Sequence, residues 1–235
     1  MKKLILPLLA VCSLVALFGC NNRPDSDSLH LTQASELKPM QQSYRGLLPC
    51  EDCSGIETTL FLDKDGSWVM NMAYQGRTPQ ISNASYGTWA RTADKLVLTD
   101  SKGQRSYFRP EGDTLVMMDA DGVPLDPKRF TLKPANLPLP ATPMVMRGKY
   151  FYMADSAVFT DCDTGRKTLV ESNAEIERGY LAARGDQSRA VLVVMHGHFA
   201  QGANPDTGAA VVQIVVDGSN HTFMPDKDCS DLATQ

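Results

Sequence analysis

The 235-residue sequence lacks the motifs by which common hydrolytic enzymes are recognised. It contains neither Gly-x-Ser-x-Gly, the nucleophile turn of serine hydrolases, nor His-Glu-x-x-His, the zinc-binding helix of metalloproteases. The stretch 202–208 has the composition of a turn-rich loop and not that of a phosphate-binding loop. The sequence gives no positive reason to expect an enzyme, and we expect a protein that is not one.

Clustered positive charge and long hydrophobic runs are scarce as well. The chain has 23 basic and 27 acidic residues, a net charge of −4, and the basic residues form no stripe. This argues against nucleic acid as a partner. Beyond residue 19, no segment approaches the length of a membrane-spanning helix.

The first 19 residues are typical of a secretory signal peptide. Lys2 and Lys3 precede a short apolar run that ends at Gly19, and the run is too short to span a bilayer. Cys20 follows directly, and this arrangement resembles the lipobox of bacterial lipoproteins. In that class the cysteine becomes the first residue of the mature chain and carries acyl chains, and two or more chains anchor a protein stably. We expect a lipid anchor on Cys20; the alternative is an ordinary signal peptide followed by an accidental cysteine.

The cysteine count indicates two disulfide bonds. Of six cysteines, Cys12 lies in the signal peptide and Cys20 is the lipid site; the other four are Cys50, Cys53, Cys162 and Cys229. An even number in an exported protein favours disulfides, and three pairings are open. The simplest pairing joins Cys50 to Cys53 and Cys162 to Cys229, and the chain layout supports it.

Composition divides the chain beyond the signal peptide into a tether, two domains and a linker. Residues 20–43 are polar and read as a lipidated tether. Residues 44–133 hold short strands about ten residues apart, separated by turn dipeptides such as Asp65-Gly66, which predicts a meander closing into a barrel or sandwich. Four prolines within ten residues mark 134–146 as a stiff linker. The second domain is predicted over 147–235.

The second domain has the element order of an OB-fold. Three strand-like runs precede a helix that starts near Ser172, with Glu175 three residues later completing a capping box. Two long strands and a short one at 221–224 follow. A helix between the third and fourth of five strands is typical of the OB barrel; a sandwich with an inserted helix is the competing interpretation.

The Cys50-Glu51-Asp52-Cys53 stretch permits three interpretations. Redox catalysis is disfavoured, because the setting is strand-rich and the two acids oppose thiolate formation. A structural disulfide is the simplest interpretation, and a Cu(I) site is the alternative, since soft thiolate and thioether ligands suit Cu(I). The chain has 11 methionines, and those within the predicted domains and linker are read first as core residues. Met195, His196 and His198 form a second candidate metal cluster.

Several stretches carry a resemblance to the NlpE family of lipoproteins. They are 17–23, 44–58, 86–92, 150–155, 180–185 and 204–208. The match spans essentially the whole chain and preserves the five cysteines of the lipobox and the body. The resemblance implies an all-β protein with one helix: a lipocalin-like barrel over 44–133 and an OB-fold barrel over 147–235.

The resemblance also implies a role. The family consists of outer-membrane lipoproteins that activate the Cpx envelope-stress pathway through the periplasmic sensor domain of its kinase, with links to copper tolerance and surface contact. Asn21, which is not the aspartate that retains lipoproteins in the inner membrane, implies outer-membrane sorting. No cofactor is expected to be required, copper is a candidate ligand of Cys50 and Cys53, and a homodimer is a candidate assembly. The alternatives are a Cu(I)-binding lipoprotein and a lipocalin-like carrier of a small ligand.

Overall fold

A computed structural model describes residues 42–204 and 207–232, which all lie in one compact unit, Leu37–Gln235. The predicted signal peptide, Cys20 and nearly all of the predicted tether lie outside the described residues. Within the described part, no helix is both long enough and apolar enough to cross a bilayer.

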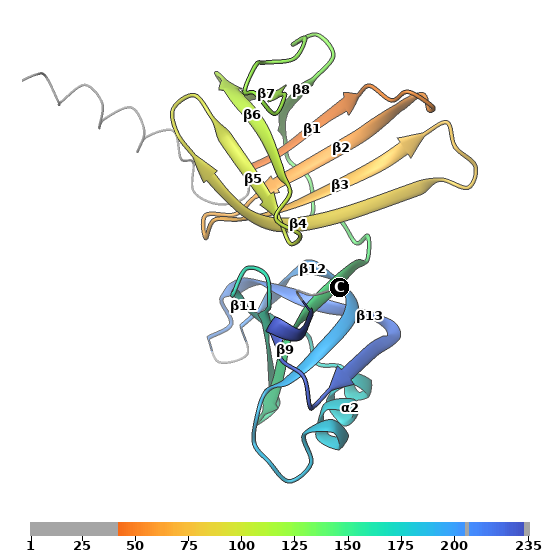
Figure 1. Cartoon of the computed structure of the whole chain (residues 1–235), viewed down its shortest axis with the longest axis vertical. Coiled ribbons are helices and arrows are strands. Elements are labelled where there is room, and N and C mark those ends of the chain that lie inside the picture. The colour runs from red at the N-terminus through yellow and green to blue at the C-terminus, as the bar shows by residue number, and fades with distance from the viewer. Residues whose placement is uncertain (1–41, 205–206, 233–235) are drawn as a thin grey trace, which may run out of the picture. The chain divides into compact units, whose positions relative to one another are not determined.

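The first part of the described chain is a closed antiparallel barrel, here called barrel 1 (Figure 1). Each strand pairs with the next along the chain, and the last pairs with the first, which confirms the predicted lipocalin-like meander. The eight strands are β1 (Gln42–Leu48), β2 (Gly55–Leu62), β3 (Ser67–Gln75), β4 (Ile81–Arg91), β5 (Leu96–Asp100), β6 (Arg105–Glu111), β7 (Thr114–Met118) and β8 (Thr131–Ala135).

The last three residues of strand β2, Leu60-Phe61-Leu62, are apolar on both faces of the sheet, and this has a consequence outside the barrel. Leu60 pairs with Tyr44 and Met70 on the inner face, where Leu60 is completely buried. The next residue, Phe61, points outward because side chains alternate along a strand. Phe61 is in register with Val69, and Val69 with Tyr86. These three outward residues, here called the outer patch, are each less than 10% exposed.

The second part of the chain is a five-stranded closed barrel with one helix, here called barrel 2 (Figure 1). The strand order β10-β11-β13-β12-β9, with the helix between the third and fourth strands of the chain, confirms the OB-fold prediction. The elements are β9 (Met144–Met153), β10 (Ser156–Asp161), β11 (Lys167–Val170), α2 (Ala174–Arg184), β12 (Val191–Ala203), β13 (Ala210–Met224) and the 3-10 helix η1 (Cys229–Leu232).

The start of α2 differs from the prediction. Asn173, and not Ser172, is the N-cap: its side chain accepts hydrogen bonds from the N–H groups of Glu175 and Ile176. Glu177, and not Glu175, reaches back to accept the N–H of Asn173 at 3.0 Å. The predicted capping box is therefore wrong, because asparagine caps a helix as well as serine does and the helix begins one residue later.

Two strand boundaries also differ from the expected ones. Residues 221–224 are not a separate strand but the end of β13. Strand β9 begins at Met144, inside the stretch predicted as linker, because Met144 and Met146 both point into the core and are at most 3% exposed. The segment between β8 and β9 is therefore 136–143.

Candidate functional site

Cys50 and Cys53 form a disulfide in the turn between β1 and β2, at one end of barrel 1; we call it the rim disulfide. Their Cα atoms lie 5.3 Å apart. The turn is tied to the end of β3, since the N–H of Ser54 donates to the carbonyl of Gln75 at 3.0 Å, and to the β3–β4 loop, since Asp52 forms an ion pair with Arg77. The guanidinium of Arg77 in turn lies 5.5 Å from the ring centroid of Tyr74.

The rim disulfide is the candidate metal site in the described part of the chain. The sulfur atoms of Cys50 and Cys53 and a carboxylate oxygen of Asp52 all lie within 4.8 Å of one another. Among the described residues, this is the one group of three or more such ligands. Because thiolates and not disulfide sulfurs bind soft metals, the group could hold Cu(I) only after reduction.

Met195, His196 and His198 do not come together as a site. The side chain of Met195 is fully buried in the core. Nδ1 of His198 pairs instead with the carboxylate of Asp217 on the adjacent strand, at 2.9 Å. The Nδ1 atom of His196 is buried without a hydrogen-bond partner.

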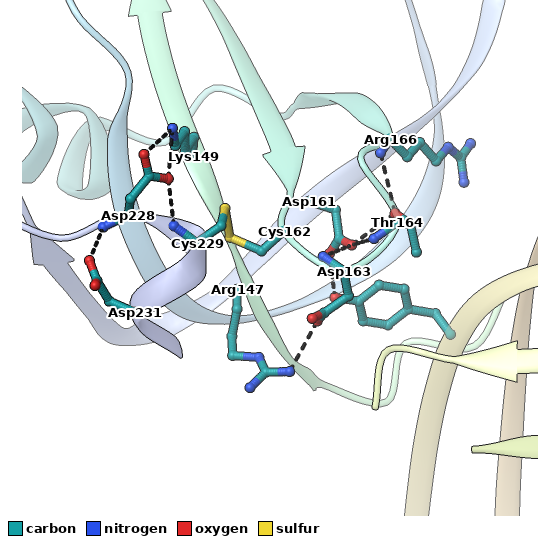
Figure 2. The surroundings of a disulfide bond; sticks show 11 residues. Arg147, Lys149, Asp161, Cys162, Asp163, Thr164, Arg166, Asp228, Cys229 and Asp231 are labelled. Atoms are coloured by element: carbon teal, nitrogen blue, oxygen red, sulfur yellow. Dashed lines mark hydrogen bonds and ion pairs between the residues drawn. A yellow bond between two sulfur atoms is a disulfide. The ribbon is translucent and has the colours of Figure 1, made fainter. Parts of the chain in front are cut away.

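Cys162 and Cys229 form the second disulfide, which we call the tail disulfide (Figure 2). Cys162 directly follows β10, and Cys229 begins η1 in the C-terminal tail. The bond joins residues 67 apart in sequence, with Cα atoms 5.3 Å apart. It therefore fastens the tail to the turn between β10 and β11.

Charged side chains hold the tail on both sides of Cys229. The ammonium of Lys149 lies 2.8 Å from a carboxylate oxygen of Asp228, and the N–H of Cys229 donates to the same carboxylate at 2.6 Å (Figure 2). The hydrogen bond from Lys149, and then that from Cys229, lower the pKa of the Asp228 carboxyl below its usual value. The N–H of Asp228 donates to Asp231 at 2.7 Å, which closes the turn around η1.

The segment 161–166, here called the disulfide turn, is built around the buried carboxylate of Asp161. One oxygen of Asp161 accepts the N–H and the hydroxyl of Thr164 at 2.7 and 2.8 Å, and the N–H of Asp163 at 3.1 Å (Figure 2). The side chain of Asp163 forms a 3.0 Å ion pair with Arg147. These bonds fix the conformation of the backbone on both sides of Cys162.

The disulfide turn also contacts barrel 1. The other oxygen of Asp161 accepts the hydroxyl of Tyr86 at 2.7 Å in a buried hydrogen bond. Arg166, at the other end of the turn, donates to the hydroxyl of Ser67 at 2.6 Å and lies 2.7 Å from a carboxylate oxygen of Asp65. Burial, reinforced by the charge of Asp161, raises the pKa of Tyr86 far above its usual value, so its hydroxyl keeps its proton and donates.

Reasoning from the sequence missed this contact. Asp65 was read only as a turn residue, and Asp161 and Arg166 carry no motif. The available signal was the apolar run Leu60-Phe61-Leu62, since a strand that is apolar on both faces is typically covered on both faces.

Comparison with known proteins places the chain in a class and then in a family. It carries the barrels of a bacterial lipoprotein family whose models match two consecutive ranges: "NlpE N-terminal domain" over 44–128 and "NlpE C-terminal OB domain" over 140–230. Lipoprotein NlpE of Escherichia coli K12 is 56% identical over 233 residues, which cover 98% of each chain. The chain therefore belongs to the NlpE family.

Two solved structures were also matched. The crystal structure of the Cpx pathway activator NlpE from Escherichia coli has 57% sequence identity and a TM-score of 0.41, and the match covers 81% of this chain and 99% of that one. That of a lipoprotein from Shewanella oneidensis has 27% identity and a TM-score of 0.38, and the match covers 45% of this chain and 96% of that one.

Proposed function

We propose that this protein is an outer-membrane lipoprotein that senses envelope stress and surface contact and activates the Cpx two-component pathway. Its body would lie in the periplasm, and its partner would be the periplasmic sensor domain of the Cpx kinase. The observation that carries the proposal is 56% identity, over 98% of the chain, to the Escherichia coli lipoprotein, which is described as a Cpx pathway activator. A role of this kind requires no catalysis.

The lipid anchor supplies the mechanism by which a sorting failure would be sensed. Once sorted to the outer membrane, acylated Cys20 holds the body away from the kinase. If sorting fails, the anchor stays in the inner membrane and the body meets the sensor domain at a high effective concentration. A flexible chain with the length of residues 21–43 would span about 26 Å on average, at about 5.5 Å × √n, which would let the body reach a membrane-embedded partner.

The tail disulfide supplies a second input. While it is intact, the C-terminal tail is fastened to barrel 2. If oxidation fails, barrel 2 loosens and signalling rises. The two inputs therefore depend on different cysteines. Acylated Cys20 makes signalling depend on lipoprotein sorting, and the bond between Cys162 and Cys229 makes it depend on oxidative folding.

We expect Cys162→Ser in the full-length protein to raise the output of a Cpx-responsive promoter several-fold in cells that lack the native copy. The physical reason is the loss of the constraint on the tail. Cys50→Ser is the matched control, because it removes a disulfide of the other barrel and leaves the tail fastened. Unchanged output for Cys162→Ser, at equal protein abundance, would show that the tail disulfide is not an input.

A second function, Cu(I) binding, is favoured by the proximity of Cys50, Cys53 and Asp52. In the reduced full-length protein, two thiolates and a carboxylate would then face one point, with methionines as further soft ligands. Titration with Cu(I) is expected to show binding tighter than micromolar, which the double variant Cys50→Ser/Cys53→Ser abolishes and Cys162→Ser/Cys229→Ser retains. Micromolar or weaker binding by the wild-type protein removes the copper role.

A further inference from the structure

The residues that contact barrel 1 and the residue that forms the tail disulfide belong to the same six-residue turn. Asp161, which accepts the hydroxyl of Tyr86, immediately precedes Cys162. Arg166, which contacts Ser67 and Asp65, follows four residues later. A change in the backbone at Cys162 therefore acts directly on both contacts.

Asp161 makes the turn and its contact with Tyr86 depend on each other. Asp161 is only 6% exposed, and its carboxylate accepts three hydrogen bonds within the turn and one from Tyr86. A buried carboxylate is costly unless its hydrogen bonds are made, and bonds to an ionised acceptor are stronger than neutral ones. If the turn loses its conformation, the carboxylate of Asp161 becomes exposed to solvent and is hydrated by water. Its hydrogen bond with the hydroxyl of Tyr86 is then lost as well.

Arg166 forms the second contact between the disulfide turn and barrel 1. Its guanidinium contacts Ser67 and Asp65 and lies 5.8 Å from the ring centroid of Phe199 in barrel 2. It therefore connects the β2–β3 turn of barrel 1 to the wall of barrel 2. An arginine with several partners is held in one orientation better than an isolated ion pair would be.

Both contacts lie at the outer patch of barrel 1, because one is made by Tyr86 and the other by Ser67, two residues before Val69 on β3. Tyr86 belongs to the patch, and its ring packs edge-on against that of Phe199 with centroids 5.5 Å apart. Phe61, Val69 and Tyr86 share one buried cluster with Met146, Phe159 and Phe199 of barrel 2. If barrel 2 moves away, three adjacent apolar side chains of barrel 1 become exposed, and exposed apolar clusters are typical of protein-binding sites.

We infer that the disulfide turn is a redox-sensitive latch that holds barrel 2 over the outer patch. With the tail disulfide intact, the turn keeps its contacts with Tyr86, Ser67 and Asp65, and the patch is covered by the chain's own second barrel. Loss of the disulfide loosens the turn and uncovers the patch. That the uncovered patch raises signalling rests on the proposed function; the latch itself does not.

Hydroxyl-radical footprinting of the full-length lipidated protein in detergent micelles tests the latch. In Cys162→Ser/Cys229→Ser, labelling of Phe61, Tyr86 and Phe199 is expected to rise several-fold over wild type. Cys50→Ser/Cys53→Ser, which lacks the rim disulfide only, is expected to match wild type at these residues. Far-UV circular dichroism establishes that each variant retains its strands.

A second variant opens the latch without touching a disulfide. Tyr86→Phe/Arg166→Gln removes the hydroxyl donor and the cation, and the same rise in labelling of Phe61 and Phe199 is expected. Arg109→Gln is the control, because Arg109 pairs with Glu111 inside β6. Wild-type labelling in either the disulfide or the latch variant, with the fold retained, overturns the latch.

The promoter reporter separates the latch from the signalling role. Increased labelling together with increased output supports both. Increased labelling with unchanged output in both variants leaves the latch standing and overturns the role of the uncovered patch in signalling.

Discussion

Serine at both Cys162 and Cys229 is expected to lower the free energy of unfolding of barrel 2 by about 4 kcal/mol. The tail disulfide closes a loop between residues 67 apart, and the constraint on the unfolded chain grows with loop length. The rim disulfide joins residues only three apart, so Cys50→Ser/Cys53→Ser should cost about 2 kcal/mol. The tail disulfide therefore dominates the stability that cysteine oxidation contributes.

Denaturant unfolding can assign each effect to its barrel. The two tryptophans of the chain, Trp68 and Trp89, are both in barrel 1, so tryptophan fluorescence follows that barrel while circular dichroism follows both. The tail variant should shift the circular dichroism transition more than the fluorescence transition. Equal losses of stability in the tail and rim variants would contradict the loop-length argument.

Gly148→Ala is expected to destabilise barrel 2 by about 3 kcal/mol or more. A Cβ atom at Gly148 would lie 2.4 Å from the ring of Phe159 and 2.4 Å from the carbonyl oxygen of Thr160. Phe159 is 1% exposed and cannot swing out, and the carbonyl belongs to the adjacent strand β10. The only relief is to separate β9 from β10 next to the disulfide turn.

Gly165→Ala is the matched control in the same barrel. No atom lies within 4 Å of the added Cβ, but Gly165 has φ of 70°, so the expected cost is about 1 kcal/mol from backbone conformation alone. Thermal unfolding followed by circular dichroism compares the two. If both substitutions cost the same, close packing at Gly148 is not what limits this strand pair.

Much of the fold could be predicted because its signals are local. Turn dipeptides such as Asp65-Gly66 separate the strands of barrel 1, and a capped helix between the third and fourth strands identifies the OB order of barrel 2. The errors fall where two local signals compete. Ser172 and Asn173 are adjacent caps, and Met144 follows directly on a proline-rich stretch although its side chain packs in the core.

The candidate site could be predicted only in part. The sequence identifies candidate ligand and disulfide residues, but it does not identify the residues that they contact in the fold. Cys50 and Cys53 stood out by spacing, and the structure adds Arg77 as the partner of the intervening Asp52. The expectation that Met195 joins His196 and His198 conflicts with the alternation of side chains along a strand, which the sequence alone already shows. Adjacent residues of a strand point to opposite faces, and Met195 points into the core.

By itself, the sequence determined which class of protein this is: two successive β-barrels, the second of the OB type, in a chain of the NlpE family. Alternation and turn residues act over a few positions, so they are readable without coordinates. Only the tertiary structure decided what covers the outer patch, because the Tyr86–Asp161 and Ser67–Arg166 contacts join residues 75 and 99 apart. Such contacts depend on strand register and twist accumulated over two barrels, which no local pattern records.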